Sequence, residues 1–150
     1  MRLLCPHPPL PRSRIFGSSM NPLAAYLVIG LGSALGGVAR YGCGALAATL
    51  WPVAFPWMTI LINILGSFVI GLFATLTGPD GRLLVGTLWR QFVMVGICGG
   101  YTTFSAFSLE TVVLLRAGRP LAAGGNVLLS MALCLLAVWF GHRLARKLNQ

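Results

Sequence analysis

Acidic side chains are nearly absent from this chain of 150 residues, which has 2 Asp and Glu residues against 11 Lys and Arg. Asp80 lies in a predicted turn and Glu110 in an apolar run, so we expect no carboxylate pair for acid–base catalysis within one chain. The sequence also lacks a nucleophile elbow and a phosphate-binding loop. These absences argue against an enzyme.

Metal-ligand spacing is missing too, because the 4 cysteines form no C-x-x-C pair and the 2 histidines, His7 and His142, lie far apart. Cysteine is interpreted here as a small apolar residue. The net charge of +9 comes without a basic stripe interleaved with exposed aromatic residues, so it does not indicate a nucleic-acid surface. It is better explained by anchoring of membrane-helix ends.

What the chain does contain is apolar sequence: hydrophobic residues make up 57% of it, charged residues 9%, and the mean hydropathy is +0.84. These values are typical of an integral membrane protein. A helix needs about 20 apolar residues to span the hydrocarbon core. Four runs meet this requirement, and breaker segments at 51–56, 78–81 and 117–120 separate them. We therefore predict an all-α protein with four transmembrane helices, at residues 23–44, 57–77, 90–115 and 121–141.

The first nineteen residues differ from the rest, with four prolines, three arginines and no continuous apolar core of a signal peptide. We expect residues 1–19 to be disordered, or to be a mis-assigned extension. Met20 is a plausible true start, because Met20-Asn-Pro leads directly into the first apolar run. Residues 20–150 are then expected to form one four-helix domain.

The third run is interrupted by glycines and hydroxyl side chains, in the order Gly99-Gly-Tyr-Thr102-Thr103. In a membrane a non-helical backbone is tolerated where protein buries it or where it lines a cavity, so a break in the third helix is predicted here. Asn63 is a costly residue in the middle of the second run unless it is paired. It serves either as an interhelical hydrogen-bond partner or as an amide donor to a passing ion.

Several further groups of residues are candidates for packing or for a polar path. Phe104 and Phe107 share one helical face, where they either pack or present ring edges, and Ser105 and Ser108 are expected to bond back to their own helix. Arg40 either snorkels to the membrane surface or faces a cavity. Two sets of residues follow from helical spacing: a semi-polar stripe of Asn126, Ser130 and Cys134, and the small-residue pairs Gly32/Gly36, Gly96/Gly100 and Ser67/Gly71.

Three segments together resemble the CrcB/Fluc family of fluoride channels: GGVARY at 36–41, TILINILGSFVIG at 59–71 and GGYTTFSAF at 99–107. The resemblance extends from Met20 to the C-terminus. It implies a passive, fluoride-selective channel of the bacterial inner membrane that exports cytoplasmic fluoride and reduces its toxicity. It also implies an antiparallel, dual-topology homodimer with two pores.

Fluoride is small and tightly hydrated, so its pore must replace water by N–H and O–H donors and by aromatic ring edges. The resemblance implies that Asn63, Thr103, Phe104, Phe107 and Ser130 form the fluoride path and that Arg40 stands in a vestibule. It further implies a structural sodium ion at the dimer interface, held by main-chain oxygens of Gly99 and Thr102. Three residues depart from the family pattern, in which Thr, Tyr and Ser are more usual: Ala106, Asn126 and Cys134.

An antiparallel dimer requires a small bias in the distribution of positive charge. Counted from Met20, the expected side of the termini carries five basic residues and the opposite side three. Counted from Met1 the ratio becomes eight to three, so dual topology favours the later start. The residues concerned are Arg82, Arg90, Arg143, Arg146 and Lys147 against Arg40, Arg116 and Arg119.

Two other functions remain open at the level of sequence. A small four-helix exporter of lipophilic cations would need a titratable carboxylate, and Glu110 is the only candidate; Glu110→Gln would then abolish export but leave a passive pore conducting. A local ion pair with Arg116 or Arg119 is the simpler explanation of Glu110. The third possibility, a structural subunit of a larger complex, predicts no flux from the purified protein.

Overall fold

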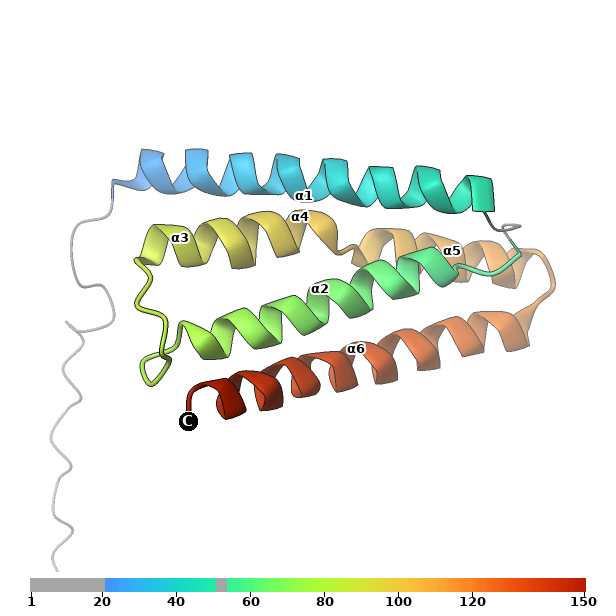
Figure 1. Cartoon of the computed structure of the whole chain (residues 1–150). Helices are drawn as coiled ribbons and strands as arrows, with labels where there is room; N and C mark the ends of the chain where they lie inside the picture. The colour runs from blue at the N-terminus through green and yellow to red at the C-terminus, as the bar shows by residue number, and fades with distance from the viewer. Residues whose placement is uncertain (1–20, 51–53) are drawn as a thin grey trace, which may run out of the picture.

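The computed structural model describes residues 21–50 and 54–150, in which every regular element is a helix (Figure 1). Three long helices, α1 (Pro22–Leu50), α2 (Trp57–Leu76) and α6 (Pro120–Leu148), are continuous. The expectations for residues 1–19 and for a start at Met20 lie outside the described residues.

The third span is assembled from several pieces. It begins with α3 (Thr87–Gln91), continues through a π-helical segment, η2 (Phe92–Cys98), and a short α4 (Gly99–Tyr101), and resumes after a break as α5 (Phe104–Arg116). π-helical segments within α-helices often occur at functional sites. The predicted interruption of the third helix is present between Tyr101, where α4 ends, and Phe104, where α5 begins.

Four segments are long and apolar enough to cross a membrane: Pro22–Thr49, Trp57–Leu76, Thr87–Arg116 and Pro120–Leu148. The prediction of four spans is confirmed. The first and last helices extend further than predicted, because hydropathy reports the hydrocarbon core while a helix can continue into the interface. The extra turns of α6 carry the basic residues Arg143, Arg146 and Lys147.

Close approaches of glycine backbones determine how α1 packs on the third span. A Cβ on Gly32 would lie 2.9 Å from the Cα of Gly96, and a Cβ on Gly36 would lie 2.7 Å from the amide nitrogen of Tyr101. A Cβ on Gly100 would in turn lie 2.8 Å from the Cα of Ser33. Both predicted GxxxG pairs are thus true contacts, and they face each other.

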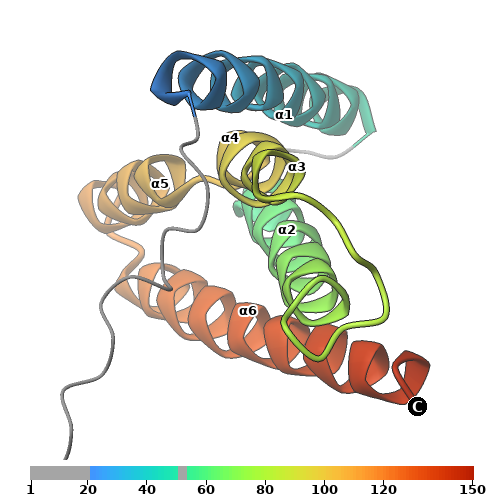
Figure 2. The ribbon, with the colours of Figure 1, turned by 90° about the vertical axis from the view of Figure 1, so that its left-hand side faces the viewer.

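The most extensive helix pair is α2 with α6, as the end-on view in Figure 2 illustrates. Gly71 packs against the backbone of Val138, and Gly141 packs against the backbone of Phe68 and Leu72. The turn into α6 uses Gly118 at φ +68°, a left-handed conformation that favours glycine. Pro120 then opens the helix at a position where its missing N–H is not needed.

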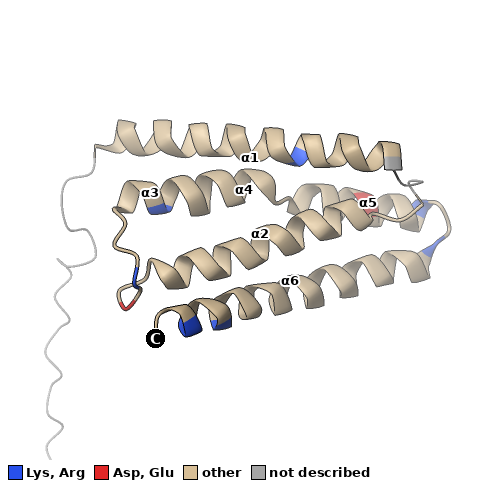
Figure 3. Ribbon diagram, viewed as in Figure 1, with Lys and Arg blue, Asp and Glu red and all other residues tan. Residues whose placement is uncertain are grey.

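The outer surfaces of the helical bundle are apolar, and its charged residues gather mainly toward the ends of the bundle (Figure 3). Large side chains on α1, including Leu27, Leu35, Val38 and Tyr41, are exposed. Such surfaces need lipid or another protein to cover them. The arrangement is that of a multi-pass membrane protein.

Candidate functional site

The break in the third span lies at Thr102 and Thr103, both of which have extended backbone (ψ 159° and 119°). The sequence predicted the break within Gly99–Thr103, but the two glycines are helical, and Gly100 lets α1 approach. Thr102 ends the helix with both its amide and its hydroxyl, which donate to the carbonyl oxygen of Cys98 at 3.0 and 2.9 Å. The break is therefore narrowed to the two threonines at the end of the predicted segment.

Asn63 on α2 holds the break open through two hydrogen bonds to one residue. Its Nδ2 donates to the carbonyl oxygen of Thr103 at 3.0 Å, and its Oδ1 accepts from the Thr103 amide at 2.8 Å. The interhelical role is thus present, and it leaves the second N–H of the carboxamide available. The prediction that Asn63 donates to a passing ion is compatible with this geometry.

Carbonyl groups in the last turn before the break lose their helical donors, among them those of Gly99 and Gly100. In a continuous helix the Thr103 amide would donate to Gly99, but it donates to Asn63. The carbonyl oxygen of Gly100 accepts instead from Nε of Arg40 at 3.2 Å. Arg40 is therefore tied to the break, which argues against simple snorkelling.

The first turn of α5 is capped by Thr103, whose Oγ1 accepts from the Ala106 amide at 3.1 Å. Ser108 bonds back to the carbonyl oxygen of Phe104 at 2.9 Å, as predicted. Ser105 differs, because its Oγ lies 3.1 Å from Oγ1 of Thr103. The hydroxyl groups here stabilise the restart of the helix.

A cavity of about 400 Å³ opens beside the break, and we call it the break cavity. Phe104 and Phe107 both line it, with ring centroids 5.2 Å apart and planes inclined at 48°. Phe107 is nearly buried, with 9% of its surface exposed, whereas Phe104 is 79% exposed in the single protomer. The cavity brings together seven predicted site residues: Asn63, Gly99, Thr102, Thr103, Phe104, Phe107 and Ser130.

The semi-polar stripe of α6 divides between two roles. Ser130 and Cys134 line the break cavity, but Asn126 is fully buried and does not. Nδ2 of Asn126 donates to Oγ1 of Thr111 at 2.9 Å, and Thr111 donates to the carbonyl oxygen of Phe107. Ser130 donates to Oδ1 of Asn126 at 3.4 Å, so Asn126 orients the serine from behind.

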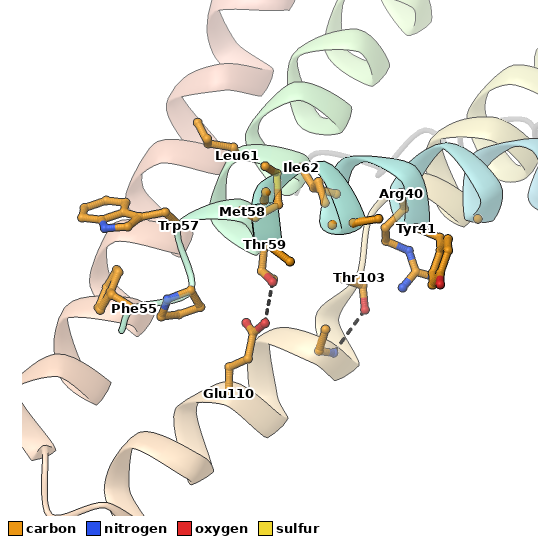
Figure 4. A pocket seen from close by; sticks show the side chains of 17 residues that line it. Arg40, Tyr41, Phe55, Trp57, Met58, Thr59, Leu61, Ile62, Thr103 and Glu110 are labelled. Carbon is orange, nitrogen blue, oxygen red and sulfur yellow. Dashed lines mark hydrogen bonds between the residues drawn. The ribbon is translucent and has the colours of Figure 1, made fainter. Parts of the chain in front are cut away.

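A larger cavity of about 920 Å³ lies between α1, α2 and α5, and we call it the Arg40 cavity (Figure 4). Arg40 and Tyr41 approach it from α1, and Thr103 and Glu110 line its other side. Thr103 therefore borders both cavities. Most of the remaining lining is apolar, which leaves Arg40 as its one basic residue among the described side chains.

Glu110 does not form the ion pair expected with Arg116 or Arg119. Its Oε1 accepts a hydrogen bond from Oγ1 of Thr59 at 2.7 Å, and its buried Oε2 has no partner among the described residues. Arg119 instead donates to the carbonyl oxygen of Ala54 at 2.7 Å. The ion-pair explanation was wrong because the Glu110 side chain is directed toward Thr59 on α2 and not toward Arg116 at the end of its own helix or Arg119 in the turn that follows.

Main-chain oxygens are the available ligands for a cation at the break. The described residues contain no group of three His, Cys, Asp or Glu side chains placed to hold a metal. The Gly99 carbonyl has lost its helical donor, and the extended backbone at Thr102 turns its carbonyl out of the helix. Oxygens of this kind fit a hard cation such as sodium.

Two residues of this region were not identified from the sequence. Thr59 was quoted only as part of a motif, and Thr111 was not considered. Both bond across helices, so their partners depend on the register of α5 against α2 and α6. No spacing along the chain reports that register.

Four apolar spans with a broken third helix, and a largely apolar cavity that carries a few polar groups at the break, define a class of membrane protein built to handle a polar solute. Residues 27–142 match the family model described as CrcB-like protein, Camphor Resistance (CrcB). The chain belongs to this family.

Three curated relatives align with this chain over nearly their whole length. A protein from Opitutus terrae is 54% identical over 127 residues, which is 85% of this chain and 96% of the relative. Proteins from Methylocella silvestris and Paramagnetospirillum magneticum are also 54% identical, covering 83% and 85% of this chain and 95% and 100% of their own lengths. Each of the three is named as a fluoride-specific ion channel, FluC.

Proposed function

We propose that this protein is a fluoride-selective ion channel of the bacterial inner membrane, which lets cytoplasmic fluoride leave passively and so reduces its toxicity. The observation that carries the proposal is the break cavity, where an amide, a hydroxyl and two aromatic rings converge in an otherwise apolar bundle. Family membership and the names of the relatives support it.

The donors of the break cavity match the needs of a small hydrated anion. Asn63 is fixed by Thr103 and keeps a spare N–H. The single O–H of Ser130, which donates to Asn126 at 3.4 Å, has to turn from that long hydrogen bond toward the anion to act as a donor. Phe104 and Phe107 offer ring edges, which carry partial positive charge. These groups replace water around fluoride without a fixed charge that would trap it.

Arg40 supplies positive charge on the α1 side of the Arg40 cavity, opposite Glu110, and there it favours anions beside the break. The inside-negative membrane potential then drives fluoride outward, with about 2.3 kcal/mol per charge per 100 mV. Hydrogen fluoride enters as a neutral acid and dissociates in the less acidic cytoplasm. No coupling residue is needed for export.

The working unit is proposed to be an antiparallel homodimer. Support comes from the exposed apolar face of α1 and from Phe104, which is largely uncovered in one protomer. A sodium ion held by the Gly99 and Thr102 carbonyls would place a fixed positive charge at the interface. The test is thermal stability of the purified dimer in sodium against N-methylglucamine, in which replacement of sodium is expected to lower stability.

The direct test of function is ion efflux from liposomes that contain the purified protein. Valinomycin releases the counter-charge, and electrodes record fluoride and chloride. Fast fluoride loss with chloride retained supports a selective channel. No fluoride loss from a folded, dimeric preparation would overturn the proposal, and it would also be the result expected of a purely structural subunit.

A coupled exporter of lipophilic cations is the alternative. The observation that favours it is Oε2 of Glu110 beside the Arg40 cavity, which has no partner among the residues that the structure describes. The two functions differ in their driving force. An exporter would accumulate tetraphenylphosphonium in liposomes under a proton gradient, and it would lose this activity in Glu110→Gln. A channel moves fluoride with membrane potential alone and does not accumulate the organic cation.

A further inference from the structure

Sulfur side chains gather around the break cavity to a degree that a fluoride path does not require. Met94 and Cys98 line it from η2, and Met131 and Cys134 line it from α6. Within each pair the residues are about one helical turn apart, so their side chains are neighbours on one face. Two cysteines and two methionines therefore line one space of about 400 Å³.

The chemistry of these four side chains selects one class of ligand. Thiolate and thioether sulfur bind soft cations such as Cu(I), and the same softness applies to Ag(I). A hard or borderline ion such as zinc prefers nitrogen, oxygen or further thiolate ligands, and the described residues hold no cluster of three His, Cys, Asp or Glu side chains. The cavity thus distinguishes soft monovalent cations from the common divalent ones.

We propose that the break cavity is an inhibitory site for a soft monovalent cation, Cu(I) or Ag(I), held by Cys98 and Cys134 with support from Met94 and Met131. The inference of inhibition rests on the proposed function, because the same cavity contains Asn63 and Ser130. On binding, a sulfur–metal bond forms and the thiol releases its proton to water, so no oxidant or reductant is consumed. The bound ion occupies the space through which fluoride passes.

The remaining described cysteine provides a matched control. Sγ of Cys43 on α1 lies 3.5 Å from the hydroxyl oxygen of Tyr101, and Cys43 does not line the break cavity. Cys5 lies outside the described residues, so every protein tested carries Cys5→Ser. Cys43→Ser removes the thiol outside the cavity and keeps Cys98 and Cys134, whereas Cys98→Ala/Cys134→Ser keeps Cys43 and so reports what silver does at a thiol elsewhere in the bundle.

The first experiment measures silver binding without any flux. Purified dimer in a chloride-free buffer is titrated with silver nitrate, and bound silver per chain is determined by calorimetry and elemental analysis. We expect Cys98→Ala/Cys134→Ser to bind less silver per chain, and more weakly, than Cys43→Ser. Equal binding by these two proteins would overturn the site, whatever the protein transports.

The second experiment adds silver during fluoride efflux from liposomes in potassium gluconate, and each protein is compared with its own rate before addition. We expect silver to reduce efflux through Cys43→Ser to the leak of protein-free liposomes, and excess thiosulfate to restore it. Met131→Leu should need more silver for the same inhibition. Full inhibition of Cys98→Ala/Cys134→Ser would overturn the proposal, whereas absence of efflux before silver would count against the proposed function alone.

Discussion

Asn63 and Thr103 form a closed pair in which the carboxamide of one residue satisfies both the amide and the carbonyl of the other, at 2.8 and 3.0 Å. The pair substitutes for the hydrogen bonds that the third span loses at its break. A non-helical backbone at membrane depth is tolerated only where other hydrogen bonds replace those of the helix. Asn63 therefore maintains the opening that it also lines.

Asn63→Leu should be among the most damaging single changes in the protein. Leucine has a similar size but leaves the Thr103 amide and carbonyl unpaired, at a cost of about 1–3 kcal/mol for each group. We expect both a lower unfolding temperature in detergent and loss of fluoride efflux. Ser67→Ala, further along α2 on the same cavity, is the control and should remain stable. Unchanged stability of Asn63→Leu would contradict the role of the pair.

Thr103 has a second role, as the cap of α5. Thr103→Ala removes the acceptor for the Ala106 amide and should destabilise the protein by about 0.5–2 kcal/mol. Thr103→Ser keeps a hydroxyl at the same place and should remain close to the parent protein. The comparison is made by thermal unfolding of the two variants in the same detergent. If serine is as harmful as alanine, the methyl group and not the cap is what matters.

The contact between α1 and the third span can be tested with two adjacent glycines. A Cβ on Gly36 would collide with the backbone of Ile97 and Tyr101, whereas a Cβ on Gly37 meets nothing within 4 Å. Gly36→Ala should cost about 1–3 kcal/mol through overpacking. Gly37→Ala should be neutral or slightly stabilising, because alanine is the better helix former. Thermal unfolding of both variants decides, and equal effects would refute the predicted packing.

Much of this fold follows from the sequence because a membrane imposes simple rules. Apolar runs of sufficient length predicted all four spans, and the GxxxG spacing of α1 and of the third span predicted a contact between them. The predicted ends of α1 and α6 were less accurate, because both helices continue beyond the predicted residues. Hydropathy does not register where a helix stops once it has left the hydrocarbon.

The sequence allowed the residues of the site to be predicted, but not the hydrogen bonds between them. Asn63 and the threonines were conspicuous because polar groups are costly among apolar residues. Their partners were not, since these depend on how the helices are rotated against one another. Glu110 illustrates the limit: neighbours in sequence suggested an arginine, while the helix places its oxygen 2.7 Å from the hydroxyl of Thr59.

Truncation of Phe104 and of Phe107 to alanine is expected to have different effects on stability. Phe107 is nearly buried within the protomer, so Phe107→Ala should cost about 3–5 kcal/mol by leaving a cavity. Phe104 is 79% exposed in the protomer and loses little packing there when it is truncated. Phe104→Ala should therefore keep the protomer fold, measured by circular dichroism during heating, yet reduce fluoride efflux.

Leucine variants at the same positions distinguish packing from the aromatic ring. Leucine retains most of the apolar contact but has no electropositive ring edge. Phe107→Leu should recover much of the stability lost in Phe107→Ala, and neither Phe104→Leu nor Phe107→Leu should recover full efflux. Normal efflux through both leucine variants would mean that the rings only fill space, and the fluoride path would then have to rely on Asn63 and Ser130.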